Sequence, residues 1–208
     1  MSQLHPVRPP LFIQEQSWTE HLFLRCCRHS NLKGDDMATF AKRRCFFSFH
    51  YEPDCFRASQ VRNIGAIEGN QPATGNKWEE VCSGKDKAIK DWIGAQMKGK
   101  SCVVVLAGTG TANRKWINYE INKAWNDRRG VVVIDVHGLM NRDGSTSNRG
   151  SNPLYHVAVS INGVSTRLST IAKRYQPAGS TSKQRYGWIK ENLAAAVEEA
   201  ITIRSKYR

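Results

Sequence analysis

One carboxylate in this sequence has a neighbour that suggests chemistry. Glu120 lies four residues after Trp116, within the stretch of residues 101–138. Residues at this spacing project from the same side of an α-helix, so the carboxylate would lie beside an indole ring. A carboxylate in such a place can stabilise positive charge that develops on a bound substrate. Taken alone, however, Glu120 is equally a solvated helical acid, and a tryptophan such as Trp116 is more often a core residue.

The elements around this pair predict how it is positioned. Residues 103–106 and 131–134 are short, continuous β-branched and aliphatic runs, which is typical of strands covered on both faces. Between them, apolar residues recur at helical spacing at Ile117, Ile121 and then Ala124 or Trp125. The stretch therefore predicts a strand, a glycine-containing turn, a helix and a second strand, with Glu120 on the helix.

The residues before this stretch predict three further elements and a loop. An aromatic-rich strand covers residues 44–49, and a helix capped by Asp54 runs to about residue 63, with Phe56, Val61 and Ile64 as its apolar positions. Residues 66–69 form a weak second strand, and residues 69–84 read as a loop with Trp78 as an anchor. An amphipathic helix follows over residues 85–98, with three apolar pairs. These pairs are Ala88/Ile89, Trp92/Ile93 and Gln96/Met97.

The residues after it predict a long loop, a hairpin and a final helix. Residues 139–153 are rich in Gly, Ser and Asn and too long for a simple connection. Residues 157–161 and 164–168 form a hairpin around Asn162–Gly163, a strong turn signal. A helix over about residues 183–203 ends the chain, with a buried apolar stripe. Its members are Ile189, Leu193, Ala196, Val197 and Ala200.

Strands that alternate with helices predict an α/β fold with a doubly wound, mostly parallel sheet of the flavodoxin type. In such sheets ligands bind at the carboxyl ends of the strands. Those ends carry polar residues and glycines in this sequence, at residues 50–51, 108–110 and His137. We divide the chain into an N-terminal extension (1–36), a domain core (37–155) and a C-terminal hairpin and helix (156–208) that complete the same domain. Residues 1–36 lack periodicity, and we expect Met37 to be the true start.

Composition limits the class of protein. The 208 residues carry a net charge of +13, yet the basic residues are scattered and no nucleic-acid-binding motif accompanies them, so we expect no nucleic-acid partner. No apolar run reaches the ~20 residues that span a bilayer, so we expect no membrane segment. The six cysteines form no CxxC pair and no zinc-ligand spacing, so we expect no metal site and a reduced, cytoplasmic protein.

Two alternative chemistries have weaker support. Gly108–Thr109–Gly110 follows a strand and precedes a helix, and Asp135 could bind a ribose, as in dinucleotide-binding folds. The fingerprint GxGxxG would, however, need a third glycine where this chain has Asn113. A flavodoxin-like or Rossmann nucleotide binder is therefore kept as a third possibility, which predicts cofactor absorbance in the purified protein. A cysteine nucleophile has no supporting spacing.

Several motifs resemble those of TIR domains. The run CFFSFHY at residues 45–51, followed by Asp54 and Arg57, resembles the first conserved box of the family. Residues 103–121 resemble its third strand and the tryptophan-containing helix that bears the family's glutamate. The FFSFHY strand, the W-I-x-Y-E-I helix and the GSNP run at residues 150–153 are most similar to the TIR-like proteins of Thoeris anti-phage systems. The similarity covers roughly residues 42–154.

This resemblance implies an enzyme that uses NAD+ as substrate and needs no other cofactor. It would cleave the nicotinamide–ribose bond and make an ADP-ribose-derived, cyclic or conjugated signal. The resemblance assigns catalysis to Glu120 and assigns the substrate pocket to other residues at the strand ends and the helix start. These are Phe49, His50, Asn113 and Trp116, with Arg57 as a phosphate contact or, equally, a structural salt bridge.

The resemblance also implies partners and leaves one alternative function. A separate effector would sense the product, a phage-derived trigger would start synthesis, and a homo-oligomer could complete the site. The alternative is a TIR-like scaffold that assembles with partners and catalyses nothing. Glu120 argues modestly against it, because such scaffolds often lack this glutamate.

Overall fold

A computed structural model describes residues 42–69 and 86–207 of the chain. The predicted N-terminal extension, the expected start at Met37 and the predicted anchor Trp78 lie outside the described residues. No helix in the described ranges is long and apolar enough to cross a membrane.

The centre of the molecule is a parallel four-stranded sheet in the order β1-β2-β3-β6. The strands are β1 (Cys45–Phe49), β2 (Cys102–Ala107), β3 (Gly130–Asp135) and β6 (Arg174–Tyr175). Glu68 adds an isolated parallel bridge to Arg44 on the free side of β1, where the sequence predicted a weak strand. With this bridge counted as the second strand in the chain, the order is the 2-1-3-4-5 of flavodoxin-like sheets. The predicted doubly wound α/β fold is confirmed.

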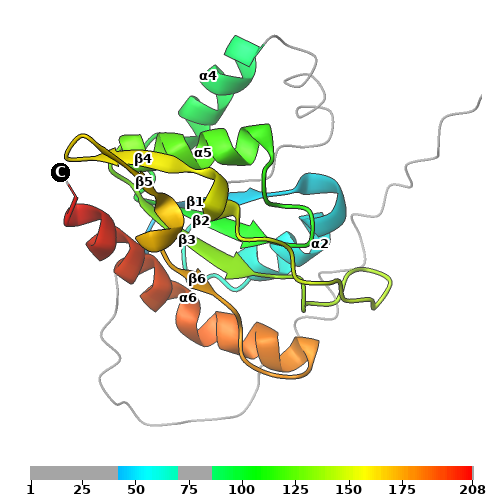
Figure 1. Ribbon diagram of the computed structural model, residues 1–208. Helices are drawn as coiled ribbons and strands as arrows, with labels where there is room; N and C mark the ends of the chain where they lie inside the picture. The colour runs from blue at the N-terminus through cyan, green and yellow to red at the C-terminus, as the bar shows by residue number, and fades with distance from the viewer. Residues whose placement is uncertain (1–41, 70–85, 208) are drawn as a thin grey trace, which may run out of the picture. The chain divides into compact units, whose positions relative to one another are not determined.

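Two helical layers cover the sheet, one on each face (Figure 1). The first holds α4 (Asp86–Met97) and α5 (Lys115–Asn126), and the second holds α2 (Tyr51–Arg62) and α6 (Ser182–Ser205). Strand side chains alternate between these layers, as the two-residue period of a strand requires. Phe46, Val105 and Val133 face the α4/α5 layer. Phe47, Val104 and Val132 face the α2/α6 layer, so each strand is covered on both sides.

The remaining elements complete the first layer. The hairpin β4 (Ala158–Ile161) and β5 (Val164–Arg167) lies between the short 3-10 helices η1 (Pro153–His156) and η2 (Leu168–Thr170). Asn162 and Gly163 form its turn with φ of 51° and 81°, the positive values that a two-residue type I′ turn requires. The predicted hairpin is therefore confirmed.

The helix α6 begins at a capping box between Thr181 and Gln184 and buries the whole predicted apolar stripe.

Some sequence expectations were wrong in detail. The helix α2 begins at Tyr51 rather than after Asp54, because Pro53 lies in the first turn, where its missing N–H costs no helical bond. Phe56 is 39% exposed and is not part of the apolar face. Ala88 is also exposed, so α4 buries only Ile89 from that pair. The sequence did not predict β6, whose two residues are too few to give a pattern.

Candidate functional site

The strand order places the topological switch point, where ligands bind in such sheets, at the carboxyl ends of β1 and β2. The chain leaves β1 toward one side of the sheet and leaves β2 toward the other, which makes this pair the topological switch point. His50 follows β1 directly, and Gly108 and Gly110 follow β2. Two strand ends that the sequence separates by more than fifty residues are thus neighbours in the fold, as the α/β prediction requires.

Glu120 lies on α5 and points at β1 of the sheet, close to this switch point. Its side chain is buried, with 7% of the residue exposed, and its Oε2 accepts a hydrogen bond of 2.5 Å from the Ser48 hydroxyl on β1. Burial raises the pKa of Glu120 from 4.5 to about 7, because the charged form loses its hydration, while the Ser48 hydrogen bond lowers it. The residue is therefore not a solvated helical acid, and it titrates near neutral pH.

Ser48 is a site residue that sequence reasoning did not single out. It follows Phe46 by two residues in β1, so it faces the α4/α5 layer, where its strand neighbours Phe46 and Val105 are apolar. A buried hydroxyl among such neighbours needs a hydrogen-bond partner, and Glu120 supplies it. The signal was present as the lone serine in the run CFFSF.

Trp116 and Asn113 lie at the start of the same helix. Trp116 is half-buried one turn before Glu120, and its ring makes an edge-to-face contact with Tyr119 at 6.1 Å between centroids. Lys115 Nζ lies 4.8 Å from the centroid of the Trp116 ring. Asn113 is exposed in the turn that leads into α5, with a φ of 60°. Trp116 thus lies one turn before Glu120 on α5, and Asn113 lies in the turn before the helix.

His50 and Phe49 point to different places. His50 precedes α2 and lies against Gly110 and near Arg114, whose Nε donates a hydrogen bond of 3.1 Å to the Gly110 carbonyl. Burial lowers the pKa of His50, and the positive charge of Arg114 lowers it further. Phe49 packs against the α2/α6 layer and stacks on Tyr51 at 6.4 Å. It is thus on the opposite face of the sheet from Glu120.

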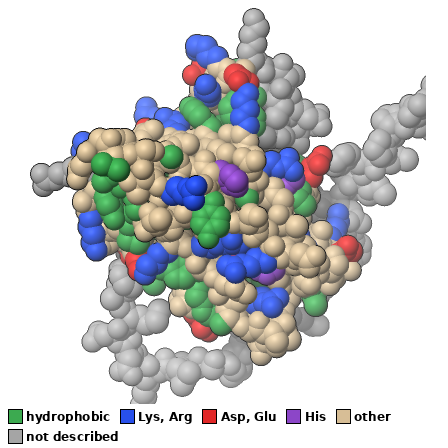
Figure 2. All heavy atoms as spheres, in the orientation of Figure 1, with side chains coloured by type: hydrophobic (Ala, Val, Ile, Leu, Met, Phe, Trp, Pro, Cys, Tyr) green, Lys and Arg blue, Asp and Glu red, His purple; other side chains and the backbone are tan. Residues whose placement is uncertain are grey.

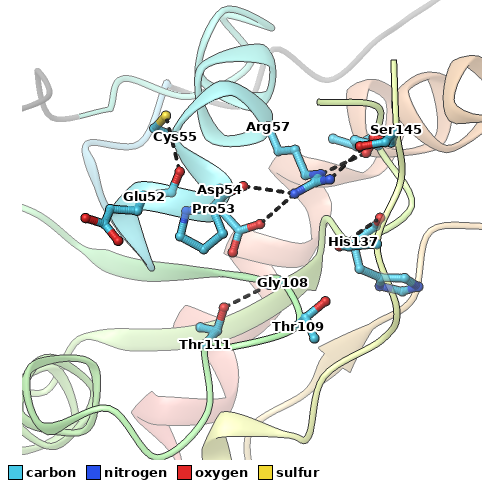
Figure 3. Close-up of polar contacts among 12 residues, drawn as sticks. Glu52, Pro53, Asp54, Cys55, Arg57, Gly108, Thr109, Thr111, His137 and Ser145 are labelled. Carbon is cyan, nitrogen blue, oxygen red and sulfur yellow. Dashed lines mark hydrogen bonds and ion pairs between the residues drawn. The ribbon is translucent and has the colours of Figure 1, made fainter. Parts of the chain in front are cut away.

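Arg57 is buried and holds three segments together (Figure 3). Its Nη1 forms an ion pair of 3.1 Å with Asp54 Oδ1, its Nε donates to the Leu139 carbonyl at 2.9 Å, and its Nη2 donates to the Ser145 carbonyl. The structural salt bridge, which was the alternative role for Arg57, is present. A contact between Arg57 and a substrate phosphate stays a prediction.

Asp54 links this group to the β2–α5 turn. Its carboxylate packs against the Gly108 backbone so closely that a Cβ at residue 108 would overlap it. The Gly108 N–H donates to Thr111 Oγ1 at 2.8 Å. Burial raises the pKa of Asp54, while Arg57 and, to a smaller extent, the Thr111 hydroxyl lower it. Gly108 is thus more than an ordinary turn residue. Sequence reasoning considered Asp54 as a helix cap and as part of the TIR-like motif, but not its contact with Gly108, which lies 54 residues further along the chain.

Asp135, at the end of β3, is bound on both carboxylate oxygens by arginines. Arg149 Nε and Arg174 Nε each donate to it at 2.7 Å. Each Asp135 oxygen thus already accepts from a protein donor, so the structure shows ion pairs for Asp135, and the ribose-binding role considered in the dinucleotide-binding alternative stays a prediction. Among the described residues, no three His, Cys, Asp or Glu side chains come together in a way that could hold a metal ion.

Comparison with known proteins gives matches over the segment that carries this site. Residues 46–141 match the family described as "Thoeris protein ThsB, TIR-like domain". The chain is also 34% identical over 116 residues to a protein of Bacillus cereus (strain MSX-D12) named "Putative cyclic ADP-D-ribose synthase ThsB1". That alignment covers 53% of this chain and 60% of the Bacillus protein, so the chain matches less than two thirds of that relative's length. The segment 46–141 includes Ser48, His50 and Glu120.

Proposed function

We infer that the chain belongs with the TIR-like domains of Thoeris ThsB proteins, because residues 46–141 match the model of that family. From this premise we propose that the chain cleaves the nicotinamide–ribose bond of NAD+ and converts the ADP-ribose unit into a cyclic signal nucleotide in anti-phage defence. The name of the similar Bacillus protein, a putative cyclic ADP-D-ribose synthase, supports this choice of product.

The observation that carries the proposal is the buried carboxyl group of Glu120, hydrogen-bonded to Ser48 near the carboxyl end of β1. Nicotinamide leaves as a neutral molecule, so the reaction needs no strong general acid. The enzyme must instead stabilise the positive charge on the ribose, which becomes oxocarbenium-like as the bond breaks. A carboxylate held in a water-poor place stabilises this positive charge more strongly than one in bulk water. Glu120 is the carboxylate that we assign to this role.

The proton balance of Glu120 agrees with such a role. With its pKa raised to about 7, the free enzyme holds a mixture of carboxylic acid and carboxylate at neutral pH. NAD+ brings a positively charged pyridinium ring, and a positive charge nearby favours the carboxylate. Substrate binding therefore converts Glu120 to the form that stabilises the transition state. We expect the ascending limb of kcat/KM to lie near pH 7 and that of kcat to lie lower.

Cyclisation also requires that water does not capture the ribose. After nicotinamide leaves, a nucleophile on the ADP-ribose unit itself must attack, and a site that excludes water favours that outcome over hydrolysis. We assign the pocket wall to Trp116, with His50 and Asn113 at the switch point. Phe49 and Arg57 remain predicted contacts, although their side chains lie on or toward the α2/α6 side of the sheet. A separate effector would sense the product, and a phage-derived trigger would start its synthesis.

The test is the loss of NAD+ by purified protein and in infected cells. Glu120→Gln keeps the size of the side chain and its ability to accept from Ser48 but removes the charge, so we expect NAD+ consumption to fall by at least about 10²-fold. Glu191→Gln is the matched control, because it removes one exposed carboxylate from α6 and should leave turnover unchanged. Mass spectrometry of the nucleotides identifies the product.

Two results would count against the proposal. Undiminished turnover by Glu120→Gln would remove Glu120 from the chemistry. Absence of NAD+ loss in wild-type protein, both purified and in infected cells, would favour the non-catalytic scaffold instead.

A further inference from the structure

A group of arginines surrounds the end of β3, outside the site assigned to Glu120. Asp135 is fully buried and binds both Arg149 and Arg174, so two guanidinium groups share one carboxylate and one positive charge remains uncompensated. Arg185 reaches the same place, because its Nη1 lies against Gly138 and donates to the Gly138 carbonyl at 3.3 Å. We call Arg149 and Arg174, which Asp135 joins, the β3-end arginine pair.

Arg149 and Arg174 differ in exposure and in the N–H groups that they leave available to a ligand. Arg174 is 11% exposed in its side chain, and its Nη2 donates to the Gly150 carbonyl at 2.9 Å, so it is held within the protein. Arg149 is 45% exposed in its side chain. In the described part of the chain only its Nε has an acceptor, which is Asp135. Its terminal N–H groups are therefore oriented by Asp135 but available to a ligand.

The electrostatic surroundings are positive. Burial lowers the pKa of the neighbouring His137; Asp135 opposes this, but the charges of Arg185, Arg149 and Arg174 lower the pKa further. Lys, Arg and His side chains gather near the centre of the face in Figure 2, and acidic side chains lie toward its margins. A site of this kind favours an anion.

The position of the pair relative to Glu120 follows from the sheet register. Ser48 is in register with Val105, and Val105 with Val133, so Asp135 lies two strands over and two residues further toward the carboxyl ends. The side chains of Ser48 and Asp135 both face the α4/α5 layer, since the register keeps Ser48, Val133 and Asp135 on one side of the sheet. With strands about 4.8 Å apart and a rise of about 3.3 Å per residue, the backbones of Asp135 and of Ser48, the partner of Glu120, are roughly 12 Å apart.

We propose that Arg149, oriented by Asp135 and Arg174, binds the diphosphate group of a dinucleotide whose reacting ribose lies at Glu120. The inference rests on the proposed function, because it takes the ribose position from Glu120. In a dinucleotide the diphosphate is one ribose away from the breaking bond. This length, together with that of the Arg149 side chain, spans the distance between Glu120 and the end of β3. Planar guanidinium groups bind phosphate oxygens through two parallel hydrogen bonds, which fixes orientation as well as charge.

In this proposal Asp135 orients Arg149 rather than binding a ribose. A free arginine side chain samples many rotamers, and ordering it on a ligand costs side-chain entropy. Asp135 holds Arg149 in place before the ligand arrives, and Arg174 fixes Asp135 from the other side. Asp135 and Arg174 are thus positioning residues, and Arg149 is the residue that contacts the ligand.

The experiment measures binding and turnover separately in the full chain. Calorimetric titration with inorganic pyrophosphate and with ADP-ribose gives affinities that require no catalysis, and steady-state kinetics give KM and kcat for NAD+. We expect Arg149→Ala to weaken binding of both ligands roughly 10- to 100-fold, and to raise KM by a similar factor with kcat changed little. Arg167→Ala is the matched control, since it removes one exposed arginine from β5 and should change neither quantity.

The outcomes separate this inference from the proposed function. ADP-ribose binding that depends on Arg149, in a protein that consumes no NAD+, keeps the diphosphate site and removes the proposed enzyme. NAD+ consumption with an unchanged KM in Arg149→Ala keeps the enzyme and overturns the site, and so does wild-type protein that binds neither ligand. Should Arg149→Ala fail to fold, Arg149→Lys keeps the charge but loses the fork, and wild-type affinity in that variant would overturn the site.

Discussion

At the scale of single residues, the molecule is organised around a carboxyl group whose protonation is set by burial. Glu120 is almost without solvent exposure, and the Ser48 hydroxyl is its hydrogen-bond partner among the described side chains. Burial favours the neutral form of a carboxyl group, because a single hydroxyl donor replaces only part of the stabilisation that water gives to the charged form. Both activity and stability should therefore depend on pH through this one group.

Ser48→Ala should shift the pH dependence of activity. The hydrogen bond from Ser48 lowers the pKa of Glu120, so its loss raises that pKa above about 7. Because the carboxylate is the active form in our proposal, the ascending limb of kcat/KM should move to higher pH by roughly one unit. A pH–rate profile of NAD+ consumption measures this. Ser59→Ala, which alters a hydroxyl on α2, is the control, and a limb that stays in place would disconnect Glu120 from the rate.

Glu120→Gln should make the protein less sensitive to pH. The folded-state pKa of about 7 lies above the ordinary 4.5, so this group's contribution to stability is fully present below pH 4.5 and is lost as pH rises through about 7. The loss amounts to about 3 kcal/mol. The neutral amide of the variant has no such loss, so its stability relative to wild type should increase between pH 4.5 and pH 8. Urea unfolding at both values measures it, and an equal difference at the two pH values would contradict the assignment.

At the scale of elements, the β2–α5 turn is tied to α2 by direct contact. The Asp54 carboxylate packs on the Gly108 backbone, and Arg57 holds Asp54 in place from the other side. Arg57 also reaches the carbonyls of Leu139 and Ser145, so the residues that connect β3 to η1 share the same anchor. The start of α5, and with it the direction of Glu120, depends on this close approach.

Gly108→Ala should therefore be destabilising. The added methyl group would overlap a buried carboxylate that cannot move without breaking its ion pair with Arg57, and such overpacking costs about 1–3 kcal/mol. Gly187→Ala is the matched control: its Cβ would meet nothing within 4 Å on α6, and alanine should stabilise that helix by about 1 kcal/mol. Chemical denaturation measures both changes. Equal stability of the two variants would show that Asp54 does not pack as described.

At the scale of the whole molecule, the sheet needs the end of the chain for half of its cover. The helix α6 supplies five buried apolar residues to the cluster on the α2 side of the sheet, and β6 pairs with β3 at the sheet edge. Burial of Ile189, Leu193 and Val197 alone stabilises by roughly 5–9 kcal/mol, which is comparable to the total stability of a domain. The helix α6 and the strand β6 thus pack on the same sheet as the elements that position Glu120.

A chain that ends after Tyr155 should lose cooperative unfolding. It would keep β1 to β3 and the helices around Glu120, but it would expose the apolar α6-facing side of the sheet to water. Near-ultraviolet circular dichroism and thermal melting of the shortened chain, compared with the full chain, measure this. A sharp melting transition in the shortened chain would show that residues 42–155 form a self-sufficient core.

Local patterns in the sequence were enough for most of the fold. Continuous β-branched runs predict β2 and β3, and helical spacing predicts α5 and the buried stripe of α6, because each pattern records which neighbours face the core. The same patterns gave Glu120 its place on α5. They misplaced the start of α2 by four residues, since a proline in a first turn looks the same as a proline that precedes a helix. They missed β6, because two residues have no period.

What the sequence determined by itself is the order of the elements and the residue types at the strand ends. Only the tertiary structure decided which of those residues meet. Ser48 and Glu120 lie 72 residues apart, and Arg174 lies 39 residues after the Asp135 that it binds. Such pairs follow from strand register and from the packing of helices on a sheet, which bring distant residues together without leaving a periodic signal in the chain. The same packing removes water from Glu120, and this burial gives the carboxyl group the raised pKa on which the proposed chemistry depends.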